Sequence, residues 1–415
     1  MATMQDTVYD GLITLFVYLF DTLIPIFRKI RFFILLPFTP ILKPITDYLF
    51  ASIGIKVSSE MKGSHADICV LDKRFYARLW SDQELGFQEM YVEEWWTTEN
   101  MDALYEKIVA FFEKNRWIAK AHIAYWEAQF RWALLNTGRE GHNFSAPPEY
   151  DLPPAYFKLM TDKEHMQLSA GYYAYGATNY AEAQVGKLTL IAAKLGLKAG
   201  MTLLDLGCGY GGLSKFMADN YGVTVVGVTV CGTMAKQARK HCSGSNVTIK
   251  KHHWRKLGGK FDRITVIEML EHVGKQNYDE FFRKIESLLN PGGQVLFQHY
   301  VTDHNVPHFS EFYCKYQFGQ VYFPSFHEFV EPSSKYLRIA NTQDLTIDAS
   351  LTCQHYLDMV DNNRAEMEAL VGPKVWRALR ITYAIPFAHG KFGTLMIYQT
   401  VLVRKDEKSR VPLAQ

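Results

Sequence analysis

The stretch LLDLGCGYGG, residues Leu203–Gly212, decides the fold class of this chain. An apolar strand, Thr202–Leu206, runs directly into a glycine-rich turn, and helix-forming residues follow the turn. Glycine lets a backbone turn sharply and approach a ligand without a Cβ clash. In open α/β sheets, ligands bind outside the carboxyl ends of the strands. The stretch therefore predicts a ligand site at the end of a buried parallel strand.

The segments around this stretch alternate between helix and strand patterns. Amphipathic helices are predicted at Ala183–Leu195 and Leu213–Tyr221. Apolar or β-branched runs predict further strands at Val223–Thr229, Arg263–Ile267 and Gln294–His299. Such alternation is typical of a doubly wound, mostly parallel sheet. We therefore expect an α/β, Rossmann-like domain.

The glycine loop differs from the loop that binds dinucleotides. A dinucleotide site needs an acidic residue about 20 residues further on, to bind the ribose. The second strand ends at Val226–Thr229 without such a residue. The pattern is instead Asp-x-Gly-x-Gly-x-Gly-Gly, in which Asp205 can order the loop or bind the amino group of a ligand. An S-adenosylmethionine pocket fits this pattern better than a pyrophosphate site does.

Composition narrows the class of protein. The chain has 415 residues, 48% hydrophobic and 21% charged, which is enough for two or three domains with a large core. Lys and Arg total 45 against 43 Asp and Glu, and this net charge of +2 argues against charge-driven nucleic-acid binding. Six cysteines without a CxxC pair indicate neither a disulfide framework nor a zinc site. We expect reduced thiols, a cytosolic setting and no bound metal.

Apolar residues are concentrated in residues 1–50. Gly11–Phe27 is apolar apart from Asp21, and it is at the lower length limit for a helix that spans a membrane. Three basic residues separate it from a shorter, proline-broken apolar run, Phe32–Ile41. One interpretation is a membrane anchor or hairpin whose basic residues lie at the headgroups. The alternative is an apolar helix that packs on the next domain. We favour the membrane-associated helical segment.

Composition also predicts the other domain boundaries. Residues 51–137 mix short strand-like and helical stretches and predict a small α+β amino-terminal domain. Residues 138–154, rich in Gly, Pro and polar residues, predict a linker. Residues 155–405 then form the α/β domain, and residues 406–415 form a polar tail.

Several further segments follow one another in a known order. They are EYDLPPAYFKLM (149–160), EAQVGKL (182–188), VVGVTV (225–230), FDRITVIEMLEHVG (261–274) and LNPGGQVLF (289–297). With the glycine loop, they resemble the cyclopropane fatty acid synthase family of S-adenosylmethionine-dependent enzymes. Upstream, IGIKV (53–57), ADICV (66–70) and LGFQEMYVEEWW (85–96) resemble the small amino-terminal domain of the full-length synthases.

This resemblance implies S-adenosylmethionine as co-substrate, a lipid substrate and a membrane surface as partners, a homodimer, and a methyltransferase activity. It also implies which residues hold the co-substrate: Asp205, Gly207, Cys208, Gly209 and Gly211 at the loop, Thr229 near the ribose, Trp254 and Arg255 beside the adenine, and Ser169 in a lid segment. Position 234, often Gln in the family, is Met here, which removes one polar contact.

An ExxEH cluster, Glu268, Glu271 and His272, follows the strand that ends at Ile267. Carboxylates at this edge of a sheet can act as a base or stabilise a cation. The alternative is that these three residues only cap helices or form salt bridges. In the synthases, the substrate double bond attacks the sulfonium methyl, and a bound bicarbonate removes a proton so that the ring closes. Glu271 matches the family glutamate of that bicarbonate site.

Other members of the bicarbonate site are replaced. Ala170 stands where the family has a lid cysteine, and Gln298 stands where it has a histidine, with His299 one place later. These departures argue against a bicarbonate cofactor and against ring closure by the usual route. We therefore predict methyl transfer to the double bond of a lipid acyl or sphingoid chain without ring closure. The predicted catalytic residues are Glu271, Glu268, His272 and His299.

Three alternatives stay open at this point. One is a cyclopropane-fatty-acyl-phospholipid synthase. Another is an N-methyltransferase of a small amine, because the ExxEH cluster also resembles the plant alkaloid N-methyltransferases. The last is a catalytically silent lipid-binding scaffold, against which the intact glycine loop argues.

Overall fold

The computed structural model describes residues 4–60, 67–115, 117, 152–302, 311–317 and 321–406. The chain divides into two compact units. Unit 1 comprises Met1–Arg139, Phe309–Gln317 and Val360–Phe392, and unit 2 comprises Glu140–His308, Phe318–Met359 and Gly393–Gln415. Nearly all of the predicted linker and most of the predicted tail lie outside the described residues.

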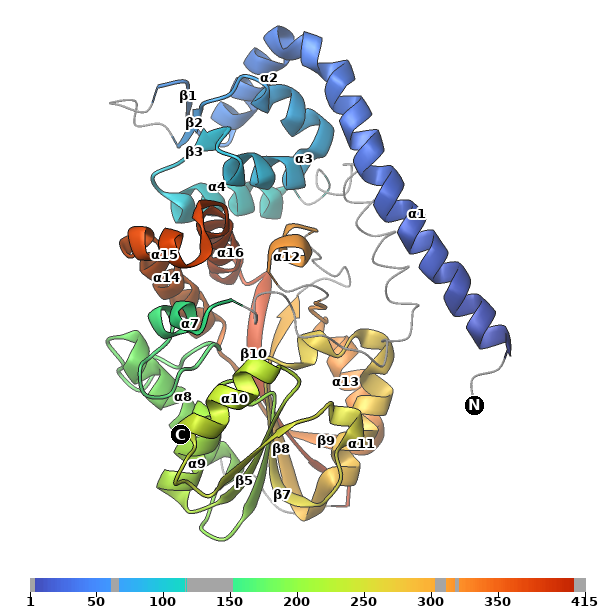
Figure 1. The fold of residues 1–415 in the computed structure, drawn as a ribbon, viewed down its shortest axis with the longest axis vertical. Coiled ribbons are helices and arrows are strands. Elements are labelled where there is room, and N and C mark those ends of the chain that lie inside the picture. The colour runs from blue at the N-terminus through green and yellow to red at the C-terminus, as the bar shows by residue number, and fades with distance from the viewer. Residues whose placement is uncertain are drawn as a thin grey trace. The chain divides into compact units, whose positions relative to one another are not determined.

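Unit 2 is built on a seven-stranded sheet in the order β6-β5-β4-β7-β8-β10-β9 (Figure 1). Its strands are β4 (Thr202–Leu206), β5 (Thr224–Thr229), β6 (Val247–Lys251), β7 (Phe261–Ile267), β8 (Leu289–Thr302), β9 (Leu337–Asp344) and β10 (Leu395–Arg404). The strands from β6 to β8 in that order are parallel, and β10 is antiparallel to both β8 and β9. The predicted α/β fold with a mostly parallel sheet is confirmed.

Helices pack on both faces of this sheet. The helices that lie wholly or mostly in unit 2 are α7 (Pro154–Met160), α8 (Tyr180–Leu195), α9 (Gly212–Tyr221), α10 (Gly232–His241), α11 (Tyr278–Leu288), α13 (Phe326–Tyr336) and α14 (Thr346–Asn362), with the short 3-10 turns η3 (Trp254–Lys256), η4 (Leu270–His272) and η5 (Lys275–Asn277). Figure 1 shows α8 and α9 on one side of the sheet and α11 and α13 on the other.

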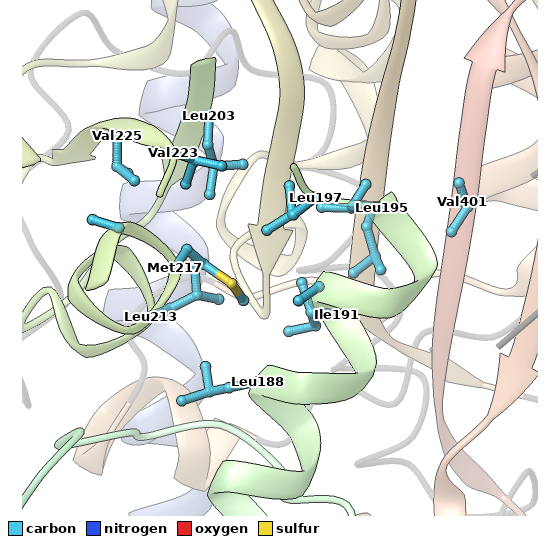
Figure 2. Packing of buried hydrophobic residues seen from close by; sticks show 13 residues of the cluster. Leu188, Ile191, Leu195, Leu197, Leu203, Leu213, Met217, Val223, Val225 and Val401 are labelled. Atoms are coloured by element: carbon cyan, nitrogen blue, oxygen red, sulfur yellow. The ribbon is translucent and has the colours of Figure 1, made fainter. Parts of the chain in front are cut away.

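The packing of α8 against α9 positions the glycine loop. The side chain of Asn179 accepts a hydrogen bond from the Glu182 N–H at the start of α8, and left-handed Gly196 ends the helix. Leu188 and Ile191 of α8 point toward Met217 of α9 in a buried apolar cluster (Figure 2). Because β4 and α9 both contribute to this cluster, the loop that joins them is held at both ends.

Unit 1 combines helices with a small sheet of order β1-β2-β3. Its elements are α1 (Met4–Leu35), η1 (Leu36–Phe38), α2 (Thr39–Ser52), β1 (Val57–Ser58), β2 (Ile68–Val70), α3 (Phe75–Val92), β3 (Trp96–Thr97), α4 (Met101–Lys114), α12 (Glu311–Tyr316), α15 (Arg364–Val371) and α16 (Pro373–Lys391). None of the helices in the described part of the chain combines the length and apolar content that crossing a bilayer requires.

The prediction that residues 155–405 form one domain differs from the structure. Residues 309–317 and 360–392 belong to unit 1, although they follow the glycine loop in sequence. Buried Arg380 on α16 explains part of this assignment, because it binds Asp361 and donates to the hydroxyl of Tyr91 on α3. Such a contact between distant parts of the sequence has no local signature.

Candidate active site

The glycine loop is closely packed on one side, at Gly211, and open on the other, at Gly209. Gly207 and Gly211 have φ of +87° and +83°, a left-handed conformation that favours glycine. The N–H groups of Gly207 and Cys208 both donate to the Val228 carbonyl, which ties the loop to the end of β5. A Cβ on Gly211 would lie 2.7 Å from Cys242 Sγ, whereas one on Gly209 would meet nothing within 4 Å. Gly207 is exposed, so this open side fits a close-lying ligand chain.

Asp205 orders the loop. Its carboxylate is buried, with one oxygen accepting from Ser214 Oγ at 2.6 Å and the other from Thr265 Oγ1 at 3.0 Å. Burial raises the pKa of Asp205 to about 6, while both hydrogen bonds oppose the rise. Since each carboxylate oxygen already has a partner, the first of the two predicted roles, ordering the loop, fits the geometry.

The residues predicted to surround the ribose and adenine lie at the same edge of the sheet, after β5 and β6. Thr229 Oγ1 accepts from the Cys231 N–H at 3.2 Å and shapes the turn after β5. Trp254 is buried and packs edge-on against Phe281, with the ring centroids 5.1 Å apart. The Arg255 guanidinium lies 4.3 Å from the centroid of the Trp254 ring and also binds Glu280.

The lid segment crosses the start of α9. The Asp162 carboxylate accepts from the His165 N–H and, at 3.1 Å, from the Gln167 N–H. A Cβ on Gly212 would lie only 1.6 Å from the His165 carbonyl oxygen, so glycine is required where the lid passes over the helix. The lid therefore has a fixed shape beside the glycine loop.

Lys187 on α8 anchors this lid, and the sequence analysis gave it no role. Its side chain is fully buried, and its Nζ donates to Gln167 Oε1 at 2.8 Å and to Ser169 Oγ at 2.6 Å. Burial lowers the pKa of Lys187, and the negative charge of Glu268 opposes this shift most strongly. A lysine on the buried face of an amphipathic helix is the sequence signal that could have found it.

Glu268 stands directly after β7 in a left-handed conformation, with φ of +47°. This conformation costs a non-glycine residue about 1–2 kcal/mol and is concentrated at functional sites. Its Oε1 accepts from the Ala170 N–H and from Gln298 Nε2, both at 2.8 Å. Burial raises the pKa of Glu268, while these two hydrogen bonds and the charge of Lys187 oppose the rise. The lid, β7 and β8 therefore converge on one carboxylate.

Glu271 is the second carboxylate, in the short turn η4. It is 4% exposed, and its Oε1 accepts from the Tyr300 N–H at 2.6 Å. Within the described residues its buried Oε2 has no hydrogen-bond partner. Burial raises the pKa of Glu271 to about 8, and the charge of Glu268 adds to the rise. Glu271 is therefore mostly protonated at neutral pH, whereas at Glu268 two hydrogen bonds and the charge of Lys187 oppose the rise in pKa that burial causes.

Glu271 makes protein stability depend on pH. Its folded pKa of about 8 exceeds the unfolded value of about 4.3, so the folded state binds more protons between these values. The free energy of unfolding should therefore fall, by about 4 kcal/mol, as pH rises from about 4.3 to about 8. We expect Glu271→Gln to flatten this dependence in urea unfolding, with Glu331→Gln as an exposed control. An unchanged slope would contradict the raised pKa.

His299 does not join the carboxylates. Successive strand residues point to opposite faces of a sheet, and Gln298, not His299, reaches Glu268 from β8. The buried His299 ring stacks on Phe329 of α13 at 4.2 Å, and burial lowers its pKa to about 4. His272 ends η4 and is next to Glu271 in the chain. Gln298, which the sequence analysis did not place in the site, is therefore the β8 partner of Glu268, and the catalytic role of His299 stays a prediction.

A model of the family described as mycolic acid cyclopropane synthetase matches residues 140–387. The chain belongs to this family. The predicted resemblance is thus confirmed. Cyclopropane-fatty-acyl-phospholipid synthase of Escherichia coli (strain K12) is 33% identical over 321 residues, which cover 74% of this chain and 79% of that protein.

Solved structures agree with this assignment. Mycolic acid cyclopropane synthase CmaA1, in complex with SAH and CTAB, is 26% identical, with a TM-score of 0.57 over 61% of this chain and 95% of CmaA1. Coclaurine N-methyltransferase, bound to N-methylheliamine and SAH, is 20% identical, with a TM-score of 0.60 over 77% of this chain and 99% of that chain. The second likeness concerns the fold alone.

As a member of this family, the chain is an S-adenosylmethionine-dependent methyltransferase, and S-adenosylmethionine is its co-substrate. When bound, the co-substrate supplies an electrophilic methyl group on a sulfonium. The open side of the glycine loop at Gly209 and the exposed backbone of Gly207 fit the co-substrate. The lid with Ser169 is the segment that would cover it.

Proposed function

We propose that the enzyme adds the methyl carbon of S-adenosylmethionine across the double bond of a lipid acyl chain and closes a cyclopropane ring. The relatives' names support ring closure, so we prefer it to the transfer without ring closure that the sequence suggested. The observation that carries the proposal is the arrangement of Glu268. Both hydrogen bonds that it accepts within the described residues go to Oε1, which leaves Oε2 available to take a proton.

The proposed reaction balances with one base. The π electron pair of the double bond forms the new bond to the methyl carbon, while the pair of the breaking carbon–sulfur bond stays on sulfur. The Glu268 carboxylate stabilises the positive charge that develops on the chain. Oε2 of Glu268 then takes a proton from the new methyl group, and the electron pair of that carbon–hydrogen bond closes the ring.

The contacts of Glu268 explain how the chain manages without the family's bicarbonate ligands. At the positions of the family's cysteine and histidine, Ala170 and Gln298 hold the Glu268 carboxylate through a backbone N–H and a side-chain amide. In this proposal the Glu268 carboxylate takes the proton that the bound bicarbonate takes in the synthases. Protonated Glu271 places no second negative charge beside Glu268, so it does not oppose the ionised form of Glu268 that the proposal requires.

A second candidate is methyl transfer that leaves a methyl branch without a ring. The replacement of the family's cysteine by Ala170 and of its histidine by Gln298 favours this candidate. In this candidate the carbocation loses a proton from a neighbouring chain carbon, which leaves a methyl-branched alkene. The two candidates therefore differ in whether the proton leaves the transferred methyl group or the chain. Isotopic labelling of that group therefore separates them.

We expect cells that express the chain and receive methyl-deuterated methionine to make lipids that carry two deuterium atoms per added carbon. Mass spectrometry of the acyl chains measures this directly. Chains that retain all three deuterium atoms would reject ring closure in favour of the second candidate. Labelled amines without labelled lipids would reject both. The control is Gly211→Val, whose side chain would clash with Cys242 Sγ and close the glycine loop.

The proposal also specifies the acceptor, the cellular location and the oligomeric state. The acceptor is a membrane lipid, unit 2 faces the cytosol, and the enzyme forms a homodimer as the family resemblance implies. The cytosolic placement is supported by five free cysteines in the described part of the chain: Cys69, Cys208, Cys231, Cys242 and Cys353.

A further inference from the structure

Helix α1 carries apolar side chains on two opposite faces. One face packs on α3 and its surroundings within unit 1. There Arg28 is buried and binds Glu311 at 2.9 Å, and Phe32 lies against Trp95 with ring centroids 6.4 Å apart. The opposite face is 42–67% exposed and consists of Tyr18, Leu19, Leu23, Ile26, Phe27, Ile30, Phe33 and Ile34. A helix that is apolar all round is normally covered on every side.

The exposed face continues through η1 into α2. Phe38, Ile41, Ile45, Tyr48 and Leu49 follow one another at helical spacing and are 44–74% exposed. Of the 22 large apolar side chains exposed in the described residues, 13 lie between residues 18 and 49. Single exposed apolar residues are normal, but a contiguous set marks a contact surface. We call these 13 side chains the apolar face.

Basic residues outnumber acidic ones beside the apolar face. Residues 18–49 contain Arg28, Lys29, Arg31 and Lys43 against Asp21 and Asp47, and Lys43 pairs with Asp47. Arg28 is engaged with Glu311, whereas Lys29 is exposed and lies at the margin of the apolar face on α1. Apolar side chains with lysine or arginine beside them suit the boundary between acyl chains and anionic headgroups. Against a second copy of the same face, this excess of positive charge would be repulsive.

We propose that α1, η1 and α2 lie in the plane of an anionic lipid surface, with the apolar face buried at the headgroup boundary. The packed face of α1 stays on α3, so the helix lies along the surface with unit 1 above it. This inference rests on unit 1 alone and does not require the proposed chemistry. It is compatible with a membrane phospholipid as acceptor.

The test is sedimentation of the full chain with vesicles of phosphatidylcholine mixed with phosphatidylglycerol. Phe27 and Phe33 are 54% and 67% exposed, and the double variant Phe27→Ser/Phe33→Ser should bind at least about tenfold more weakly. The matched control is Leu71→Ser/Phe392→Ser, which removes side chains that are 52% and 43% exposed away from the apolar face. The control should bind as the wild type does.

Several outcomes would overturn the proposal. They are a wild-type chain that stays in the supernatant, a double variant that binds unchanged, and a double variant that loses only self-association in gel filtration. Turnover of lipid in detergent micelles does not require binding to vesicles. It therefore shows whether a variant is folded and active, and a failure of the proposed function would appear in that assay and not in sedimentation. If the double variant does not fold, the wild-type chain provides the test. Its binding must weaken in high salt and on vesicles of pure phosphatidylcholine. Equal binding to vesicles with and without phosphatidylglycerol would refute the proposal.

Discussion

Glu268→Gln is expected to lower turnover by about 10²–10⁴-fold while S-adenosylmethionine binds with nearly unchanged affinity. The amide keeps the size of the side chain but cannot take a proton from the new methyl group. Its oxygen can still accept the Ala170 N–H and the Gln298 amide, so the lid keeps its anchor. Single-turnover kinetics on a monounsaturated lipid, with calorimetric titration of the co-substrate, measures both quantities.

The matched control for this substitution is Glu331→Gln, which removes an exposed carboxylate from the same unit. It should leave both turnover and affinity unchanged. If Glu268→Gln turned over at the wild-type rate, Glu268 would not be the base. If it retained turnover but released a methyl-branched product, Glu268 would serve ring closure and not methyl transfer.

Lys187→Met is expected to lower co-substrate affinity by tenfold or more and to shift the pH–rate profile. Loss of the ammonium leaves Gln167 Oε1 and Ser169 Oγ without their buried donor, at a cost of about 1–3 kcal/mol for each group. The positive charge of Lys187 also holds down the pKa of Glu268. Without it, that pKa rises, so the acidic limb of the profile should move to higher pH.

Lys194→Met provides the matched control. Lys194 is a second buried lysine on α8, and its Nζ donates to Gln399 Oε1 at 2.8 Å. Burial lowers its pKa to about 7, and no carboxylate contributes to that shift. Both variants should lose stability, but only Lys187→Met should move the acidic limb. If the acidic limb of the pH–rate profile of Lys187→Met did not move, Lys187 would have a purely structural role.

The parts of the fold that sequence reasoning predicted well depend on local patterns. β4 spans Thr202–Leu206 as predicted, because a buried parallel strand is an apolar run bounded by glycine. β9 and β10 were missed, since the half-exposed residues Leu337–Asp344 show no clean alternation and pair only with β10. The place of residues 360–392 in unit 1 depends on partners far away in the sequence.

The candidate site shows the same division. The carboxylates and the glycine loop stand in short motifs that could be found without a structure. The choice between Gln298 and His299 depends on which face of β8 each side chain occupies, and a shift of one residue reverses it. The position of Lys187 on the buried face of α8 could have drawn attention to it, but its partners, Gln167 and Ser169, lie on a separate segment whose course over α8 no local pattern encodes.

The division of unit 1 among three stretches of chain has a consequence for biosynthesis. Its first stretch leaves the ribosome early, but α15 and α16 follow only after nearly the whole of unit 2 has been made. Domains usually fold as units from the amino terminus during translation. In this chain α3 and α4 are synthesised early but pack on α16, which is synthesised near the end. Nascent α3 and α4 therefore lack α16 during most of translation. The surfaces of α3 and α4 that α16 covers in the finished protein therefore stay uncovered for most of synthesis.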